Sequence, residues 1–257
     1  MTKISVIVIA KNEEDMIADC LDSLSFCDEI VLVDNGSEDR TCDIAKRMGA
    51  KIVSLKTDDF SKLRNFGLEK SRNDWVLYLD ADERISNLLK DEIIHLTIDS
   101  GRVQQLNAYS LKRKNFYFSS SKKNEWPHIE KIERLFKRGS LKGWKGKLHE
   151  SPIIEGAIGT LDGFLLHYSH RDLSLMLAKT IEWSKIEAEL RFSAKHPRMT
   201  WWRFPRVMFT AFIDFYIRQG GWKMGTIGII ESIYQSFSVF VTYARLWEMQ
   251  LKNKNEK

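Results

Sequence analysis

The sequence of 257 residues lacks the features that mark several common protein classes. Its three cysteines, Cys20, Cys27 and Cys42, form no C-x-x-C pair, which argues against a zinc site and fits a reducing compartment. It has no G-x-G-x-x-G motif and no P-loop lysine motif, so a dinucleotide-binding or P-loop enzyme is not indicated. The longest uncharged run, Ser232 to Ala244, is shorter than the roughly 20 residues that span a bilayer, so we expect no membrane-spanning helix.

Positive charge is concentrated in the last quarter of the chain. From Arg191 onward there are 11 Lys or Arg against 4 Asp or Glu, a balance of +7, whereas the first 190 residues carry 29 against 31. Such an asymmetry predicts an anionic partner for the C-terminal region. A membrane surface fits better than nucleic acid, because the region is also rich in aromatic residues: Trp201, Trp202, Phe204, Phe209, Phe212, Phe215, Tyr216 and Trp222.

Short apolar runs alternate with helical patterns over the first hundred residues. The runs are rich in β-branched residues, which is typical of strands buried on both faces of a parallel sheet. The first run is too short for a signal-peptide core and lacks a small-residue cleavage site, so we interpret it as a strand. The right-handed β-α-β rule then predicts a doubly wound α/β domain. The expected strands are Ile4–Ile9, Glu29–Val33, Lys51–Ser54 and Trp75–Leu79, and the expected helices are Glu14–Leu24, Glu38–Met48 and Phe60–Ser71.

The pattern changes after about Asn107. Two more strands are expected, with a polar loop containing Ser119–Lys123 between them, and the glycine-rich segment Gly139–Gly163 is irregular, as binding loops are. Helical periodicity follows to the end of the chain. We therefore expect an α/β domain over residues 1–170 and a helical region over residues 171–257. The later strands are expected at Ala108–Asn115 and Lys131–Arg138, and the later helices at Asp172–Arg191, Arg203–Arg218 and Met224–Leu251.

The acidic run Asp80-Ala81-Asp82-Glu83 follows the fourth expected strand. A spacing of two in an extended chain puts the Asp80 and Asp82 carboxylates on one side, and the small Ala81 keeps the approach open. Two close carboxylates repel each other unless a cation neutralises them, and Mg²⁺ or Mn²⁺ commonly shares its coordination with a diphosphate. The run therefore predicts a site for a metal-bound diphosphate. The alternative is a polar strand exit or a helix N-cap.

Polar residues also follow the first two expected strands, where ligands of such sheets bind. They are Lys11-Asn12-Glu13-Glu14 after the first strand and Asp34 at the end of the second. Asp34 can accept a hydrogen bond from a base N–H or a ribose hydroxyl, or it can cap the turn that its Asn35-Gly36-Ser37 neighbours form. Arg64 can supply a cation to a diphosphate, and the alternative is a surface arginine.

Four motifs stand in order over the first 85 or so residues: Ile4–Glu14 (ISVIVIAKNEE), Ile30–Thr41 (IVLVDNGSEDRT), Arg64–Gly67 (RNFG) and Trp75–Glu83 (WVLYLDADE). Together they resemble the inverting glycosyltransferase family 2. The resemblance implies a GT-A fold and a nucleotide-diphosphate sugar donor. It implies that Asp34 meets the nucleotide base, with Glu14 and Arg64 near the nucleotide. It also implies that Asp80 approaches the ribose or the metal and that Asp82 ligates the metal. Asn12 and Ala81 complete the expected donor site.

The resemblance extends more weakly into the second half of the chain. Arg134-Leu135-Phe136, Leu148-His149-Glu150 and Leu166-His167-Tyr168 are similar to a branch that includes lipopolysaccharide-core β-glucosyltransferases. Members of that branch are commonly small, peripheral to the membrane, and end in helices. The loop from Ser119 to Ile132 departs from the pattern expected for one fixed acceptor, so the acceptor is not implied.

An inverting transfer needs a carboxylate that accepts the proton of the acceptor hydroxyl. The resemblance assigns this base to Glu150. Asp162 and Glu155 are alternatives from composition, and Glu150 can instead be a loop carboxylate paired with a lysine. The resemblance also offers His167 as a metal ligand. Its alternatives are His170 in that role, or a histidine that simply packs in the core.

The C-terminal helices combine arginines with aromatic residues, which is typical of interfacial helices. We therefore expect residues 198–245 to contact a membrane surface. The alternatives are an ordinary helical hairpin and the interface of a homo-oligomer.

The sequence thus predicts a cytoplasmic enzyme, peripheral on the inner face of the cell membrane. It transfers a hexose from a nucleotide sugar, UDP-glucose or similar, to a saccharide or lipid-linked acceptor in lipopolysaccharide or other envelope glycan synthesis. One alternative is a sugar nucleotidyltransferase, which would carry a glycine-rich loop where Lys11–Glu14 stands. The other is a non-catalytic, membrane-recruited nucleotide-sugar-binding protein. Nucleic acid is not an expected partner.

Overall fold

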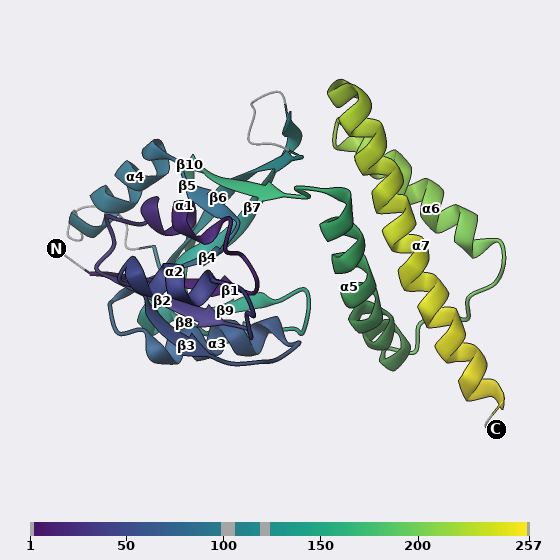
Figure 1. The fold of residues 1–257 in the computed structure, drawn as a ribbon, viewed down its shortest axis with the longest axis horizontal. Helices are drawn as coiled ribbons and strands as arrows, with labels where there is room; N and C mark the ends of the chain where they lie inside the picture. Colours follow the sequence, from purple (N-terminus) through teal and green to yellow (C-terminus); the bar gives the residue numbers. More distant parts are fainter. Residues whose placement is uncertain (1–2, 99–105, 119–123, 256–257) are drawn as a thin grey trace. The chain divides into compact units, whose positions relative to one another are not determined.

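The computed structural model describes residues 3–98, 106–118 and 124–255, which form two compact units (Figure 1). The first, which we call the sheet unit, comprises Met1–Lys114 and Ile129–His167. The second, the helical unit, comprises Asn115–His128 and Tyr168–Lys257. The sequence places the division at residue 170, three residues beyond His167, and assigns residues 115–128 to the α/β domain. The helical unit therefore also takes in a segment from the middle of the chain.

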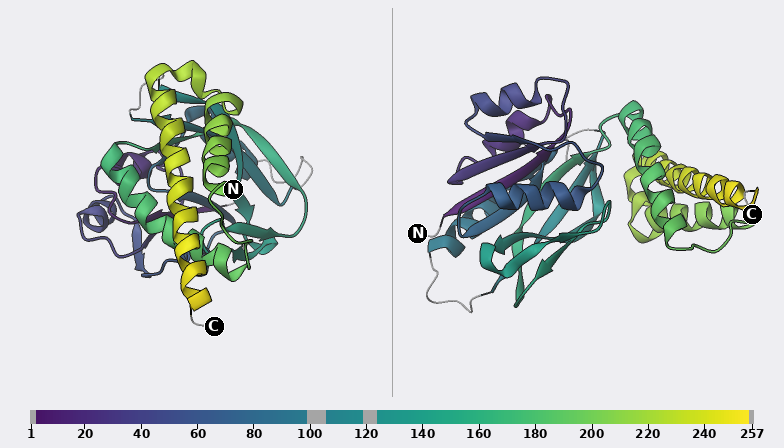
Figure 2. Two further views of the ribbon diagram at one scale, coloured as in Figure 1. Left: turned by 90° about the vertical axis from the view of Figure 1, so that its right-hand side faces the viewer. Right: turned by 90° about the horizontal axis from the view of Figure 1, so that it is seen from below.

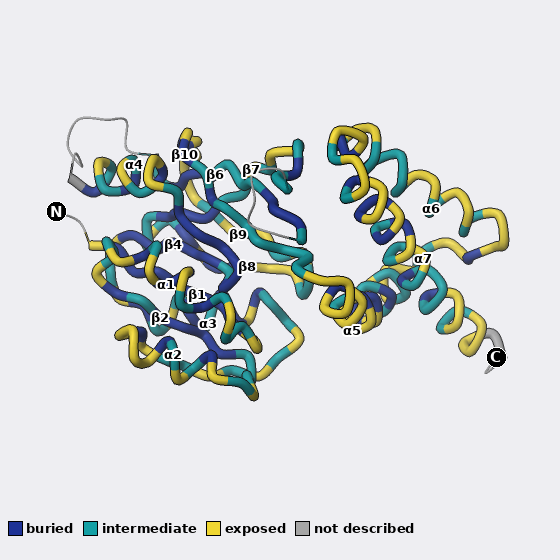
Figure 3. The backbone as a smooth tube through the Cα atoms, turned by 45° about the horizontal axis from the view of Figure 1, so that its top comes forward, coloured by how far each residue is buried: buried dark blue, intermediate teal, exposed yellow. Residues whose placement is uncertain are grey.

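One sheet is built from the strands β1 (Ile4–Ala10), β2 (Glu29–Asp34), β3 (Lys51–Ser54), β4 (Trp75–Asp80), β5 (Glu83–Ile85), β6 (Ala108–Tyr117), β7 (Glu125–Lys137) and β10 (Ile158–Ser169). Their order is β3-β2-β1-β4-β7-β6-β10-β5. The first four strands in this order are parallel neighbours, as the β-branched runs predict. β4 pairs with β7, and β10 with β5, in the antiparallel sense. Burial is concentrated on the central parallel strands, where every residue of β1 is buried (Figure 3).

The helices α1 (Ile17–Asp22), α2 (Thr41–Arg47), α3 (Phe60–Lys70) and α4 (Asn87–Ile98) belong to the sheet unit. The first three lie within the segments in which helices are predicted. α3 begins where the side chain of Asp59 accepts a hydrogen bond from the backbone N–H of Lys62. It packs directly on β1, because a Cβ at Gly67 would stand only 2.4 Å from Cγ2 of Ile7. Gly67 therefore allows α3 to lie close to the sheet.

The structure contains strands that the sequence did not predict. β10 and the hairpin of β8 (Leu141–Lys145) and β9 (Ser151–Ile154) occupy most of the segment expected to be irregular. In the first half of β10, buried residues alternate with more exposed ones. The strand was not predicted because one of the buried positions is Gly163, where an apolar side chain would have made the alternation visible in the sequence. A Cβ at Gly163 would stand 2.3 Å from the backbone nitrogen of Leu89 on α4. The polar loop at Ser119–Lys123 lies outside the described residues, and β7 begins six residues earlier than expected.

The helical unit contains α5 (Leu173–Ser193), α6 (Arg203–Ile213), a π-helical turn at Asp214–Arg218 and α7 (Gly225–Asn255). Asp172 caps α5 by accepting a hydrogen bond from the N–H of Leu175, as its sequence position predicts. α7 packs against both α5 and α6 (Figure 2). A small core of Ala188, Met199 and Leu246 forms where helix α5 and the segment before α6 meet α7.

Within the described part of the chain, Gly221–Asn253 is the one stretch whose length and composition would suit a membrane-crossing helix. The sequence did not lead us to expect such a helix, because Glu231 interrupts the uncharged run. In the structure Glu231 is fully buried, and Nδ1 of His170 lies 2.9 Å from its carboxylate. The charge of Glu231 is therefore absent from the exposed surface of α7.

Candidate active site

The carboxyl ends of three parallel strands meet at one edge of the sheet. Ala10 of β1 is in register with Asp34 of β2, and Ile9 of β1 is in register with Asp80 of β4. The expected donor-site residues after β1, β2 and β4 are thereby brought to the same edge. Ala81 is fixed there by its N–H, which donates to the carbonyl of Ile9 at 3.1 Å.

The loops after β1 and β2 hold each other by hydrogen bonds. Oδ1 of Asn12 accepts from the N–H of Glu38 at 2.8 Å, and Oε2 of Glu14 accepts from Nε of Arg40 at 2.9 Å. Asp34 accepts from the N–H groups of Gly36 and Ser37 at 3.2 and 3.0 Å. The turn-capping alternative for Asp34 is thus present in the structure, and the residue is buried beside the loop that it caps.

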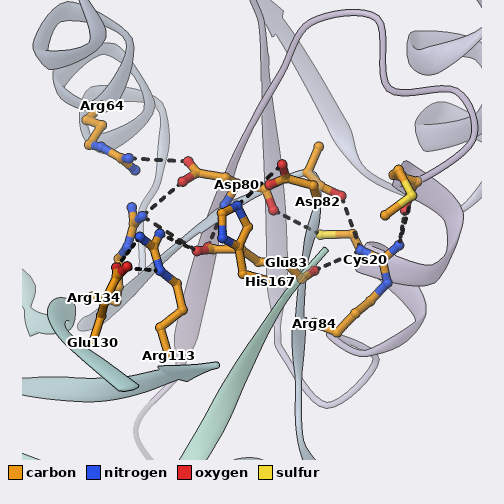
Figure 4. Close-up of polar contacts among 12 residues, drawn as sticks. Cys20, Arg64, Asp80, Asp82, Glu83, Arg84, Arg113, Glu130, Arg134 and His167 are labelled. Carbon is orange, nitrogen blue, oxygen red and sulfur yellow. Dashed lines mark hydrogen bonds and ion pairs between the residues drawn. The ribbon is translucent and has the colours of Figure 1, made fainter. Parts of the chain in front are cut away.

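Arg64 of α3 joins two carboxylates that lie far apart in the sequence, those of Asp80 and Glu150. Its Nη2 lies 3.2 Å from Oδ1 of Asp80 (Figure 4). Its Nε and Nη2 lie 2.7 and 2.6 Å from Oε1 of Glu150. The Arg64 side chain is only 3% exposed, which contradicts the alternative of a surface arginine. The observed partner of Glu150 is thus Arg64, and not a lysine as one alternative predicted.

A second arginine fixes the other oxygen of Asp80. Nη2 of Arg134, on β7, donates to Oδ2 of Asp80 at 2.9 Å (Figure 4). Burial alone raises the pKa of Asp80, but Arg134 and then Arg64 outweigh it and hold the pKa well below its usual range. Asp80 is therefore a carboxylate fixed in its ionised form, with its orientation set from two sides.

Glu83, the last residue of the acidic run, anchors the run to the sheet. It is fully buried, and its Oε2 accepts from the N–H of Asp80 at 2.9 Å. Its Oε1 lies 3.2 Å from Nη1 of Arg113 on β6 and 3.7 Å from Nη2 of Arg134. Neither arginine was predicted to have a role: Arg113 was not singled out, and Arg134 appeared only within the Arg134-Leu135-Phe136 motif. That motif was the one signal available, because no pattern along either strand marks an arginine as buried.

Asp82, in the segment between β4 and β5, and His167, on β10, approach each other. Nε2 of His167 lies 3.5 Å from Oδ2 of Asp82, and both side chains are largely buried. Burial lowers the pKa of His167, but the Asp82 carboxylate raises it by more, so the net shift is upward. The two residues expected to bind a metal are thus brought together. Within the described residues, however, no group of three or more His, Cys, Asp or Glu is arranged to hold a metal ion.

The alternatives to Glu150 and His167 lie elsewhere. The Asp162 carboxylate pairs with Lys112 and is 81% exposed, and Glu155 pairs with Lys142 and is 69% exposed. His170 belongs to the helical unit, where it pairs with Glu231. Among the carboxylates considered as the base, Glu150 is the one that Arg64 links to Asp80.

Trp144, on β8, completes the surroundings of Arg64. It is buried and packs edge-on against Tyr78 and Phe136. The guanidinium carbon of Arg64 lies 4.9 Å from the Trp144 ring centroid, which is a cation–π distance. Trp144 therefore packs around the arginine that connects Asp80 and Glu150.

Several known proteins are similar to this chain in sequence or in fold. The chain is 29% identical to an uncharacterized glycosyltransferase of Rickettsia typhi over 265 residues, covering 99% of this chain and 90% of that protein. It is 27% identical to the lipopolysaccharide core biosynthesis glycosyltransferase LpsC of Rhizobium meliloti, covering 95% and 92% of the two chains. A mannosyltransferase of Pyrobaculum calidifontis, solved with GDP-Man and Mn²⁺, has a TM-score of 0.53 at 14% identity, covering 96% of this chain and 88% of that one.

These likenesses confirm the GT-A fold and the glycosyltransferase activity that the four ordered motifs imply. The model of the family described as Glycosyl transferase family 2 matches residues 5–143. This range includes all but the first residue of β1, the strands β2 to β4, Asp80, Asp82 and both arginines that hold Asp80. The chain therefore belongs to glycosyl transferase family 2 and is a glycosyltransferase.

Proposed function

We propose that this glycosyltransferase moves a hexose, with inversion, from a nucleotide-diphosphate sugar such as UDP-glucose to a saccharide or lipid-linked acceptor. The observation that carries the proposal is the link from Asp80 through Arg64 to Glu150, which joins the strand-end edge to a candidate base. The name of the LpsC relative supports an envelope glycan as the product, and the mannosyltransferase solved with GDP-Man supports a nucleotide-sugar donor.

The donor would lie across the edge formed by the ends of β1, β2 and β4. We assign the nucleotide to Asp34, Asn12 and Glu14, whose loops are already tied together by hydrogen bonds. We assign the ribose and diphosphate to the segment Asp80-Ala81 and to Arg64. A loop framework that is already bonded in this way loses little entropy when the donor binds.

A divalent ion, Mg²⁺ or Mn²⁺, fits the pair of Asp82 and His167 as a partial site. One carboxylate and one imidazole lie 3.5 Å apart and can face the same ion. Two protein ligands are enough for Mg²⁺, which usually keeps waters and substrate phosphate oxygens in its shell. When bound, the ion would neutralise charge on the diphosphate. The metal is assigned to Asp82 and not to Asp80, because the charge of the Asp80 carboxylate is already balanced by the Arg64 and Arg134 cations, one at each of its oxygens.

Glu150 would accept the proton of the attacking hydroxyl. As the new C–O bond forms on one face of the sugar, the bond to the diphosphate breaks on the other, and the hydroxyl proton passes to the carboxylate. Both contacts from Arg64 go to Oε1, so we assign the acceptor hydroxyl to Oε2. Arg64 thereby fixes the orientation of the base toward the acceptor.

The location of the reaction follows from the acceptor that we propose. A lipid-linked or lipopolysaccharide acceptor places the enzyme at the cytoplasmic face of the cell membrane, with contact through residues 198–245. The presence of Glu150 next to Arg64 argues against a non-catalytic nucleotide-sugar-binding protein. Membership of the family argues against a sugar nucleotidyltransferase.

The test is a panel of nucleotide sugars incubated with the purified chain and Mg²⁺ or Mn²⁺, with release of free sugar as the readout. The best donor is then supplied with membrane extract, and transfer is measured for the wild type, Asp82→Ala and Glu150→Gln. We expect Asp82→Ala to lose both hydrolysis and transfer, and Glu150→Gln to bind donor but lose transfer. Full transfer by either variant would refute the assigned roles. Glu155→Gln, at an exposed carboxylate in the same segment, is the control that should retain activity.

A further inference from the structure

Helix α7 carries an apolar stripe that the rest of the helical unit leaves exposed. Its members are spaced alternately by three and four residues, so they share one helix face over about 30 Å. Apart from Ala244, each member is between 36% and 55% exposed. The α7 stripe consists of Ile230, Ile233, Phe237, Phe240, Ala244, Trp247 and Leu251.

The other faces of α7 are occupied by α5 and α6. Toward α5, the hydroxyl of Tyr234 donates to the carbonyl of Met176 at 2.7 Å. Toward α6, the hydroxyl of Ser236 donates to the carbonyl of Met208 at 3.0 Å. These hydrogen bonds to α5 and α6 come from α7 residues outside the stripe.

Between Gly225 and Ala244, α7 itself exposes no charged side chain. Glu231 is the one acidic or basic residue in that sequence, and it is fully buried. Its carboxylate lies 2.9 Å from Nδ1 of His170 and accepts a hydrogen bond from Gln235 at 2.7 Å. Burial of this single charge leaves about five helical turns with an uncharged exposed face.

Basic and aromatic residues adjoin the stripe. Phe204 of α6 packs against Phe240 of the stripe, with ring centroids 5.9 Å apart. Close to it in the sequence, Arg203 and Arg206 lie over the ring of Trp202, at 5.7 and 6.0 Å, and Trp202 is 46% exposed.

The same pairing of a cation with an exposed tryptophan recurs just before α7. Lys223 lies 5.4 Å from the centroid of the Trp222 ring, which is 56% exposed. From Lys195 to Lys223 the sequence has six Lys or Arg and one acid, Asp214. The exposed apolar surface is thus bordered by positive charge.

We infer that the α7 stripe and the adjoining segment 201–223 bind the surface of an anionic lipid bilayer, with α7 lying in the plane of the interface. This inference rests on the proposed function and deepens it, because it names the helix face that makes the membrane contact, its orientation and the lipid charge that it selects. Apolar side chains enter the interface while arginine and tryptophan meet the headgroups. Because the remaining faces of α7 hold α5 and α6, only the stripe enters the lipid.

Two comparisons within the chain favour this surface and this partner. α5 also exposes apolar residues, such as Ile181 and Trp183, but Glu182 and Lys185 lie among them. Insertion of α5 would therefore bury charge. A second copy of the chain is disfavoured as the partner, because pairing through the stripe would bring two basic segments together.

The experiment measures co-sedimentation of the full chain with phosphatidylcholine vesicles, with and without phosphatidylglycerol. The test variant is Ile233→Glu/Phe237→Glu on α7. The matched control is Leu177→Glu/Ile181→Glu, an exposed pair with the same spacing on α5. We expect the wild type to bind the anionic vesicles at least about tenfold more tightly than the neutral ones. The α7 pair should lose at least about tenfold in partitioning, and the α5 pair should stay within about twofold of the wild type.

Several results would overturn the inference: no binding by the wild type, no preference for anionic vesicles, or equal binding by the α7 pair. A dimer in light scattering that the α7 pair dissociates would assign the stripe to a second copy instead. Donor hydrolysis without vesicles is measured on the same samples. Hydrolysis without lipid binding would contradict the membrane inference alone, whereas absence of hydrolysis would contradict the proposed enzyme. If circular dichroism shows that the α7 pair does not fold, Phe237→Gln carries the same comparison.

Discussion

Arg64 and Glu150 form an ion pair 86 positions apart in the sequence, with Nε and Nη2 of the arginine 2.7 and 2.6 Å from the same carboxylate oxygen. The same guanidinium lies 3.2 Å from Asp80. One side chain from α3 therefore holds both the carboxylate at the end of β4 and the residue that we propose as the base. A planar guanidinium is suited to this, because it presents several N–H donors in a fixed geometry.

Arg64→Met should weaken both stability and transfer. The change leaves Glu150 largely buried without its partner, which is expected to cost about 3 kcal/mol in the free energy of unfolding. It also frees the orientation of Glu150, and we expect transfer to fall by about 100-fold or more. Urea denaturation and single-turnover transfer measure the two effects. Lys142→Met is the control, because Lys142 pairs with Glu155 while both side chains remain exposed, at 48% and 69%. It should change stability by less than about 1 kcal/mol, and an equal loss in both variants would contradict the role of Arg64.

The central strands were predictable from the sequence because a continuous run of apolar residues identifies a buried strand without knowledge of the strands that pair with it. β1 and β4 are runs of apolar residues, buried on both faces along nearly their whole length, so a local pattern identifies them. The start of α3 was predictable for a similar reason, since Asp59 caps it locally. Because parallel strands end at one edge, the positions of Asp34 and Asp80 followed from the topology.

The partners of these carboxylates were not predictable in the same way. Arg113 and Arg134 reach Asp80 and Glu83 from β6 and β7, strands that meet the acidic run only after the sheet is assembled. No periodicity within either strand marks an arginine as buried. The burial of Glu231 by His170 likewise joins two elements about 60 residues apart. Contacts of this kind form between elements that are distant in the sequence, so only the three-dimensional structure reveals them.

The pairing of Asp80 with Arg134 should make stability depend on pH. Because the pKa of Asp80 is held below its usual range, the folded state gains stability above the unfolded pKa of about 4 and loses it as the pH falls through the lower folded value. Arg134→Gln removes the largest favourable influence on that pKa. The loss of melting temperature caused by this variant should therefore be greatest near pH 7 and smaller near pH 3. Thermal melts across this range test the sign, and a difference that grows toward acid pH would contradict it.

Metal binding at Asp82 and His167 should appear as a shift in melting temperature. A metal that binds only the folded state stabilises it by mass action, so Mn²⁺ with a nucleoside diphosphate should raise the melting temperature of the wild type. Asp82→Asn and His167→Gln should each remove most of that shift, because each takes away one of two protein ligands. His95→Gln, on the exposed side of α4, is the histidine control and should keep it. A full shift in both site variants would place the metal elsewhere, and chelator treatment of the wild type should abolish the shift.

Gly67→Ala should disturb the site by changing how α3 packs on the sheet, although Gly67 is not itself a proposed catalytic or binding residue. The new methyl group would stand 2.4 Å from Cγ2 of Ile7 and 3.0 Å from Cγ2 of Val33, so α3 must move away from the sheet. Overpacking of this kind is expected to cost about 1–3 kcal/mol in the free energy of unfolding. Because Arg64 lies one turn earlier on the same helix, the movement should also weaken its contact with Glu150 and lower transfer. Gly139→Ala is the matched control, since no atom lies within 4 Å of its added Cβ. If both variants unfold at the same urea concentration as the wild type, α3 does not depend on the close approach at Gly67. If Gly67→Ala is less stable yet transfers sugar at the wild-type rate, the distance between α3 and the sheet does not control the contact between Arg64 and Glu150.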